Sequence, residues 1–156
     1  MFERFATSAR EMVTSAVQEA QMRGDRRIGT DHLFIGMLHD QEIIETLGVT
    51  LQRARDLDAD LDSTALRAIG LNLSGAASAW SRPPKMSRTP FSTGAKKVMK
   101  SALATAVASH SRTIKVHHIA VALLSLKAPD PAAALAAGLG IDPTEAIARL
   151  TRSEAA

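Results

Sequence analysis

The chain has 156 residues, 46% of them apolar and 3% aromatic, and a formal net charge of +3 at pH 7. This length and apolar content suit one compact domain with its own core, and the shortage of aromatic residues disfavours a β-rich fold. The absence of cysteine excludes disulfide frameworks and thiolate zinc sites, and it fits the cytoplasm. The charges in the opening MFERFATSAREMV and the lack of an apolar run of about 18 residues predict neither a signal peptide nor a membrane span.

The charges are divided unevenly along the chain. Residues 1–62 hold 12 acidic residues against 7 Lys and Arg, a balance of −5, whereas residues 63–129 hold 10 Lys and Arg and no acidic residue. This pattern predicts an acidic half and a basic half. Either the basic half attracts an anionic partner, or the two halves attract each other.

Helical periodicity dominates the first part of the chain. Apolar residues recur at helical spacing over residues 5–20, and Gly24 is expected to end that helix. Thr30 or Asp31 is expected to cap a second helix. The next two helices are predicted over residues 42–47, ending at Gly48, and over residues 51–69.

Residues 70–90 are rich in Gly, Ser and Pro and are predicted to form an irregular linker, with Trp80 docked on one of the lobes. Four more helices follow, and Pro131 and Pro143 suit first-turn positions. These helices are predicted over residues 95–106, 117–126, 131–137 and 143–152.

An internal repeat organises these elements. Residues 5–38 align without a gap to residues 91–124 at a constant offset of 86, with ten identities over 34 positions. Leu47-Gly48-Val49 then matches Leu139-Gly140-Ile141. The sequence therefore predicts an all-α fold of two pseudo-symmetric four-helix repeats forming one compact two-lobed domain. The boundaries expected are 1–69 for repeat 1, 70–90 for the linker and 91–152 for repeat 2.

Four segments carry a resemblance to a known family. They are Met-Phe-Glu-Arg-Phe at the start, Ile28-Gly29-Thr30-Asp31-His32-Leu33, the Leu47-Gly48-Val49 turn and Pro90-Phe91-Ser92. Together they resemble the double Clp repeat in the N-terminal domain of ClpC/ClpA-type Hsp100 unfoldases, here without ATPase modules. The resemblance implies a domain that recruits substrates or adaptors to an ATP-driven ring feeding a protease.

In ClpC-type relatives, an acidic residue of the turn and a hydroxyl at the start of the first helix of a repeat form a pocket for phosphorylated arginine. A carboxylate can hold the guanidinium, while helix N-terminal amides and a hydroxyl hold the phosphate. In the first repeat Asp31 supplies the acid, but Ala6 stands where the hydroxyl is expected. In the second repeat Ser92 supplies the hydroxyl, but His117 stands where the acid is expected. The remnants of the two pockets would comprise Thr7, Thr30, Asp31, Ser92 and His117. The alternative is that the turn residues are only helix caps, worth about 1 kcal/mol.

Phe2, Phe91 and Lys96 match positions that, in actinobacterial relatives, frame an apolar surface bound by cyclic peptide antibiotics and lying near docked adaptors. An exposed aromatic ring at a lobe junction can anchor a partner. The alternative is that Phe2 and Phe91 pack the two repeats together.

No catalytic, cofactor or metal site is predicted. Gly70 and Gly75 have P-loop spacing, but Ala76 and Ala77 stand where Lys and Ser or Thr are needed. The adjacent His117 and His118 point about 100° apart on a helix, which is poor geometry for one ion. His32 and His118 are expected to share a structural role, such as hydrogen bonding to a neighbouring helix. The acidic run from Asp56 to Asp62 fails as a calcium loop and is expected to be a solvated helix face.

The function predicted is a non-catalytic protein- or peptide-binding domain of the Clp chaperone–protease system, monomeric, with clients, adaptors or Clp ATPase and protease components as partners. One alternative is a basic helical protein associated with nucleic acid. Its contact residues would be Arg82, Lys85, Arg88, Lys96, Lys97 and Lys100. A third alternative is a helical enzyme that uses His117 and Asp31 as acid–base groups.

Overall fold

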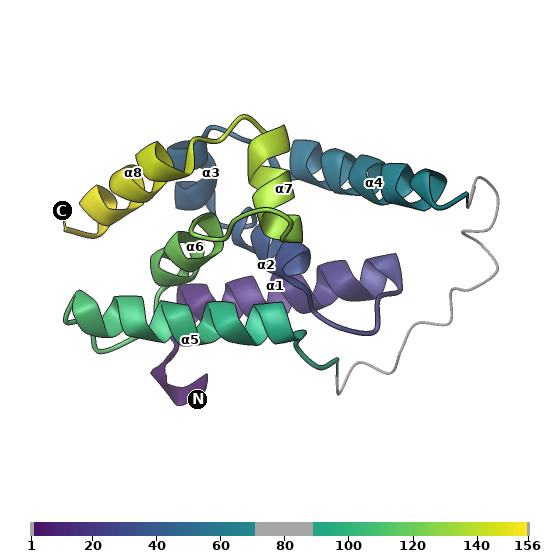
Figure 1. Cartoon of the computed structure of the whole chain (residues 1–156). Coiled ribbons are helices and arrows are strands. Elements are labelled where there is room, and N and C mark those ends of the chain that lie inside the picture. The colour runs from purple at the N-terminus through teal and green to yellow at the C-terminus, as the bar shows by residue number, and fades with distance from the viewer. Residues whose placement is uncertain (1, 71–88, 156) are drawn as a thin grey trace.

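The structure, a computed structural model, describes residues 2–70 and 89–155, apart from the side chain of Phe2. In these residues it contains a short 3-10 helix and eight α-helices (Figure 1). The elements are η1 (Phe2–Arg4), α1 (Thr7–Arg23), α2 (Thr30–Met37), α3 (Gln41–Leu47), α4 (Leu51–Ala68), α5 (Thr93–Ala108), α6 (Val116–Leu124), α7 (Pro131–Gly138) and α8 (Pro143–Ala155). The predicted all-α fold is confirmed. The predicted docking of Trp80 and most of the predicted linker lie outside the described residues.

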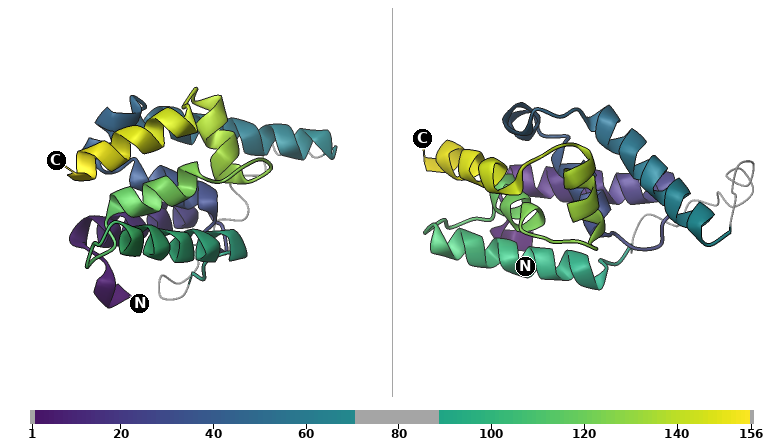
Figure 2. Two further views of the ribbon diagram at one scale, coloured as in Figure 1. Left: turned by 60° about the vertical axis from the view of Figure 1, so that its left-hand side comes forward. Right: turned by 45° about the horizontal axis from the view of Figure 1, so that its top comes forward.

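The helices form three layers. In Figures 1 and 2, α1 and α5 lie along one side, α2 and α6 occupy the middle, and α3, α4, α7 and α8 cover the other side. Every residue of α2 except Asp31 is buried, as are seven of the nine residues of α6. The buried apolar residues of both repeats form one continuous cluster, so neither repeat has a separate core.

The two repeats hold each other through two short backbone bridges. Phe5 pairs with Ile114, and Ile28 pairs with Phe91, both in parallel. Because Phe91 and Ile114 are the offset-86 counterparts of Phe5 and Ile28, the second bridge is the first with the repeats exchanged. Four hydrogen bonds of 2.7 to 2.9 Å repeat at the same offset around these bridges. This exchange is the pseudo-two-fold relation that the internal repeat predicted.

The start of α2 corrects one expectation from the sequence. Neither Thr30 nor Asp31 caps this helix, because its N-cap residue is Gly29. The N–H of Gly29 donates to Nδ1 of His32 at 2.9 Å, so the side chain of the third helical residue accepts the N–H of the N-cap residue. The equivalent bond joins the N–H of Lys115 to Nδ1 of His118, also at 2.9 Å.

Within the described residues, no helix is both long and apolar enough to cross a membrane.

Candidate functional site

The turn before α2 lies against the start of α5. The backbone N–H of Ser92 donates to the carbonyl oxygen of Ile28 at 2.9 Å, and a Cβ on Gly94 would lie 3.3 Å from Cγ2 of Thr30. Ser92 Oγ accepts a backbone N–H of α5 at 3.1 Å, which leaves its own O–H free to donate. The hydroxyl of Ser92 and the turn that carries Asp31 therefore belong to one site built from both repeats.

The pseudo-equivalent turn before α6 lies against the start of α1. The N–H of Ala6 donates to the carbonyl oxygen of Ile114 at 2.9 Å. Thr7 is exposed at the first position of α1 and makes no cap, since the N-cap residue is Ala6. Nε2 of His117 lies 3.1 Å from Oε1 of Glu42 on α3, so the histidine at this turn contacts a carboxylate of the other repeat.

The pairing of turn and helix start thus crosses the repeats, whereas the sequence analysis grouped them within each repeat. The first site keeps both functional groups, the hydroxyl of Ser92 and the carboxylate of Asp31. At the second site Ala6 and His117 occupy the equivalent positions, and the hydroxyl nearest the turn is that of Ser8, which accepts the N–H of Val116 at 3.4 Å. An alignment of one repeat on the other contains no signal for this grouping, which depends on how the two chain segments cross.

The carboxylate of Asp31 already contacts a guanidinium of the same chain. Oδ2 of Asp31 lies 3.1 Å from Nη1 of Arg23, at the end of α1. Arg23 also lies 3.3 Å from Asp25 and contacts Asp58 and Asp62 on α4. The expectation of a fully solvated acidic face is therefore wrong for Asp58, which is 5% exposed because Arg23 lies beside it.

Thr30 connects the first site to the second repeat. Its buried side chain donates from Oγ1 to Oδ1 of Asp130 at 2.7 Å. The same oxygen of Asp130 accepts the N–H of Ala132 at 2.9 Å and so caps α7. The hydroxyl of Thr30 is thus used inside the protein, whereas the hydroxyl of Ser92 donates to no acceptor among the described residues.

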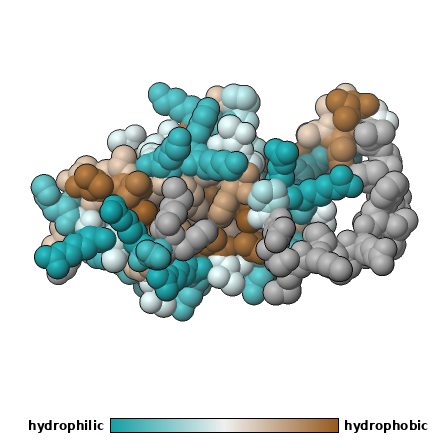
Figure 3. Space-filling view, turned by 90° about the horizontal axis from the view of Figure 1, so that it is seen from below, coloured by the Kyte–Doolittle hydropathy of each residue, from teal (hydrophilic) through white to brown (hydrophobic). Residues whose placement is uncertain are grey.

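The apolar surface expected around Phe91 and Lys96 lies on the α5 side of the molecule. Phe91 is partly buried against the core, Lys96 is exposed, and the side chain of Phe2 lies outside the described residues. Close by along α5 is a hollow of about 240 Å³ lined by Arg4, Phe5, Met99, Leu103 and Ile114. Seen from this side, apolar surface lies in the middle of the face with hydrophilic side chains around it (Figure 3).

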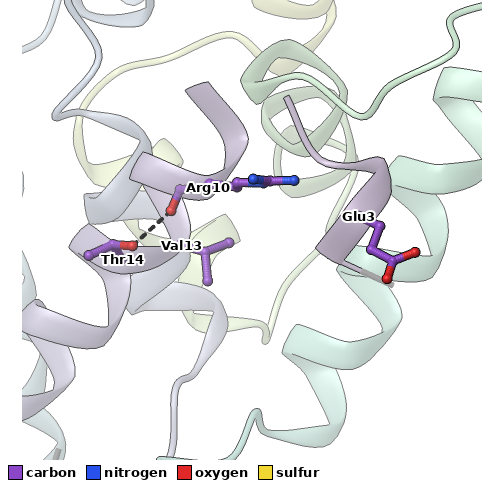
Figure 4. A pocket seen from close by; sticks show the side chains of 4 residues that line it. All are labelled: Glu3, Arg10, Val13 and Thr14. Atoms are coloured by element: carbon purple, nitrogen blue, oxygen red, sulfur yellow. Dashed lines mark hydrogen bonds between the residues drawn. The ribbon is translucent and has the colours of Figure 1, made fainter. Parts of the chain in front are cut away.

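A second hollow, of about 380 Å³, lies where η1 meets α1 and is lined by Glu3, Arg10, Val13 and Thr14 (Figure 4). Arg10 extends from α1 towards η1 across it. Thr14 donates its hydroxyl to the carbonyl oxygen of Arg10 at 2.9 Å, so this hydroxyl serves its own helix. Arg10 and Glu3 are the charged residues among its described lining, and the carboxylate of Glu3 points away from Arg10 (Figure 4).

Lys96, Lys97 and Lys100 are exposed on α5. They are half of the basic set named for nucleic-acid contact. The other half, Arg82, Lys85 and Arg88, lies outside the described residues.

The two equivalent histidines share the capping role described above but differ at their other ring nitrogen. Nε2 of His32 lies 2.8 Å from Asp25, whereas Nε2 of His118 lies 2.8 Å from Glu154 on α8. Burial lowers the pKa of His118, although Glu154 opposes this effect. In the described residues, no group of three or more His, Cys, Asp or Glu side chains is arranged to hold a metal ion.

Comparison with known proteins agrees with this architecture. Residues 4–69 match the family model described as the Clp repeat (R) N-terminal domain. Among solved structures, the fold is similar to the N-terminal domain of the caseinolytic protease-associated chaperone ClpD from Arabidopsis thaliana, with a TM-score of 0.75 and 23% identity over 100% of this chain and 97% of that one. It is also similar to the Hsp104 N-terminal domain from Candida albicans, with a TM-score of 0.65 and 15% identity over 96% of this chain and 91% of that one. Residues 4–69 therefore match the Clp N-terminal repeat family, and the chain as a whole shares its fold with the N-terminal domains of ClpD and Hsp104.

Proposed function

We propose that this chain is a non-catalytic module of a cytoplasmic Clp chaperone–protease system that binds proteins or peptides. In that role it captures substrates, or it acts as an adaptor or decoy for an ATPase partner. The Clp repeat pattern of residues 4–69 and the fold shared with ClpD support the proposal. So does the nature of the described surface, which offers turns, helix starts and a shallow apolar hollow rather than a set of converging acid–base groups.

The observation that carries the proposal is the first cross-repeat site. It combines the hydroxyl of Ser92, the start of the 16-residue helix α5 and the carboxylate of Asp31. A phosphate fits the hydroxyl and the helix start, and a guanidinium fits the carboxylate. Phosphorylated arginine on a client protein carries both groups. Since Arg23 already contacts Asp31, the incoming guanidinium would compete with that internal contact.

Titration calorimetry with phosphoarginine, and with a peptide that carries it, tests this site. Wild-type protein is expected to bind one equivalent, Ser92→Ala to bind at least about tenfold more weakly, and Arg23→Gln to bind more tightly because the competing guanidinium is gone. His117→Ala at the second turn is the matched control and is expected to bind like wild type. No binding by the wild type, or equal weakening by Ser92→Ala and His117→Ala, would exclude the first site as a phosphoarginine pocket.

The apolar face on α5 is tested separately, by affinity capture from the native lysate followed by mass spectrometry. Lys96→Glu and Phe2→Ala are expected to reduce capture of Clp subunits, adaptors or cyclic peptide antibiotics. Lys97→Glu carries the same charge change on the same helix and serves as the control. If all three variants capture the same proteins as the wild type, this face is not the docking surface.

The nucleic-acid alternative makes a different prediction. Binding to duplex DNA would weaken steeply with salt, with a slope set by the number of phosphates contacted, and Lys97→Glu and Lys100→Glu would each lower that slope by about 1. Absence of salt-sensitive binding would remove this alternative.

A further inference from the structure

Helix α4 is attached to the rest of the molecule by a few apolar side chains, Leu51, Ala54 and Leu57, and by several ion pairs. Ala54 and Asp58 are its only buried residues. The side chain of Leu57 lies against Gly138 of α7. The C-terminal half of α4 extends beyond α7 in both Figure 1 and Figure 2 and carries the exposed Leu61. Few buried apolar contacts make this helix an element of low local stability.

The charged attachment centres on Arg23 at the end of α1. Its guanidinium contacts four carboxylates, which come from the segment after α1, from α2 and from α4. They are Asp25, Asp31, Asp58 and Asp62. With all four ionised, the cluster carries −4 against the single +1 of Arg23, an excess of three negative charges. Like charges crowded around one cation repel one another, and burial of Asp58 strengthens that repulsion.

The neighbouring ionisable groups do not supply the missing positive charge. Arg55 on α4 is bound to Glu19 of α1, with Nη2 to Oε1 at 2.5 Å, and Glu19 also contacts His39. His32 lies 2.8 Å from Asp25 and 3.3 Å from Asp31, but its Nδ1 accepts the N–H of Gly29 and so carries no proton while that bond is made. Helix α7, which packs on the other side of α4, has the sequence PAAALAAG and no titratable side chain. Among the described residues, the excess charge around Arg23 is therefore relieved most directly by a proton.

We propose that this Arg23 cluster is a proton-responsive latch, in which uptake of a proton by one carboxylate on mild acidification tightens the docking of α4 onto α1 and α2. The inference goes beyond the function proposed above, because it concerns the attachment of a helix and not a ligand, although Arg23 and Asp31 take part in both.

Asp58 is the carboxylate that takes the proton. Burial, together with the nearby charges of Asp31 and Asp62, raises the pKa of Asp58 to about 6 against the opposing effects of Arg23 and His32. The ordinary value is 3.8, so the docked helix binds the proton more tightly than the free helix does. Docking consequently strengthens as the pH falls through 6, and it weakens as the pH rises above that value.

Other carboxylates of this region act in the opposite direction, at lower pH. The hydrogen bond from His32 lowers the pKa of Asp25. Burial alone would raise the pKa of Glu19, but the hydrogen bonds from Arg55 and His39 outweigh it and lower that pKa. Both groups contribute to stability when ionised and lose that contribution only in stronger acid, so neither carboxylate opposes Asp58 between pH 7.5 and pH 5.0.

Hydrogen exchange of peptides from residues 51–68, corrected for the intrinsic rate at each pH, tests the latch. In the wild type, protection of α4 is expected to rise by about tenfold between pH 7.5 and pH 5.0, from the shift of the Asp58 pKa. Asp58→Asn keeps an acceptor for Arg23 without the charge, so it should show high protection at pH 7.5 and no rise at pH 5.0. Arg23→Gln should lose protection at pH 7.5. Asp56→Asn, an exposed change on the same helix, should keep the wild-type response.

His32 and His39 also face these carboxylates. The wild-type pH profile alone therefore does not assign the response to Asp58, and the comparison with Asp58→Asn does. Peptides from α5 and α6 report whether a variant still folds. If α5 and α6 remain protected but Asp58→Asn lowers protection of α4 at pH 7.5, Asp58 is an ordinary ion-pair anchor and the latch is wrong. Wild-type protection of α4 that stays constant or falls towards pH 5.0 would also overturn it.

Discussion

Equivalent residues end the first helix of each repeat in the same left-handed conformation but with different side chains. Gly24 has a φ of 74° and its counterpart His110 a φ of 55°. Glycine adopts this conformation without strain, whereas a residue with a Cβ pays about 1 to 2 kcal/mol. We expect His110→Gly to stabilise the protein by about 0.5 to 1 kcal/mol, after the greater freedom of glycine in the unfolded chain is subtracted. Urea unfolding measures the change. Gly24→Ala should destabilise, and an unchanged or lower midpoint for His110→Gly would contradict the argument.

The buried histidine at the start of α6 predicts a second pH effect. Nδ1 of His118 accepts the N–H of Lys115, and protonation of that nitrogen would break this bond. Because burial lowers the pKa of His118 below 6.5, its contribution to stability is complete above pH 6.5 and declines as the pH falls towards its folded pKa. His118→Gln should cost about 1 to 3 kcal/mol at pH 7.5 and clearly less at pH 5.5, measured by urea unfolding. Ser101→Ala, at an exposed position, is the control, and a cost that does not depend on pH would rule out this account.

At the residue scale the sequence predicted most helix boundaries to within about two residues, but it did not predict the capping of α2. Gly24 and Gly48 end α1 and α3 as expected, since a positive φ selects glycine locally. The start of α2 was predicted wrongly, because Thr30 and Asp31 have the right chemistry for capping but are turned towards Asp130 and Arg23. His32, which accepts the N–H of the N-cap residue, is not a residue that capping preferences favour.

The close crossing of α1 and α2 depends on Gly36, which lies inside α2 and not in a turn. A Cβ on Gly36 would lie 2.8 Å from the carbonyl oxygen of Met12 and 3.0 Å from Cβ of Ala16. The first of these atoms is backbone and cannot turn aside, so the helices would have to separate. Gly36→Ala should therefore destabilise by about 1 to 3 kcal/mol in spite of its better helix propensity, as thermal unfolding would show.

The equivalent position in α6 provides the control for this crossing. Ala122 replaces Gly36 there and is buried, so α5 and α6 accommodate the methyl group that α1 and α2 exclude. Ala122→Gly should cost about 1 kcal/mol through helix propensity alone. A stabilising Gly36→Ala would mean that the α1–α2 crossing is not fixed by this contact.

At the scale of elements, the sequence predicted the eight α-helices of the described residues but not the burial of Asp58 on α4. The spacing of Ala95, Val98, Met99, Ala102 and Ala106 on α5 is the spacing of its buried face. Helix α4 buries a carboxylate, and its position depends on an arginine 35 residues earlier in the chain. Periodicity describes one helix at a time and contains no information about such a partner.

The same limit holds for the whole molecule. The offset of 86 predicted two repeats and their pseudo-symmetry, because identities such as Phe5 with Phe91 and Ile28 with Ile114 are visible in the sequence. It did not predict that each of these residues pairs with the other repeat. That exchange decides the composition of the candidate site, since it unites Ser92 with Asp31 and leaves Ala6 with His117.

If the repeats depend on each other in this way, a destabilising substitution in one repeat must also lower the stability of the other. Phe5 is 4% exposed and pairs with Ile114, so Phe5→Ala should cost about 3 to 5 kcal/mol through the cavity it leaves. We expect hydrogen exchange to accelerate in α5 and α6 as much as in α1 and α2, and urea unfolding to remain a single transition. Phe91→Ala, at the equivalent but only partly buried position, should show the same pattern with a smaller loss. Faster exchange confined to α1 and α2 would mean that the two bridges join repeats that are stable independently of each other.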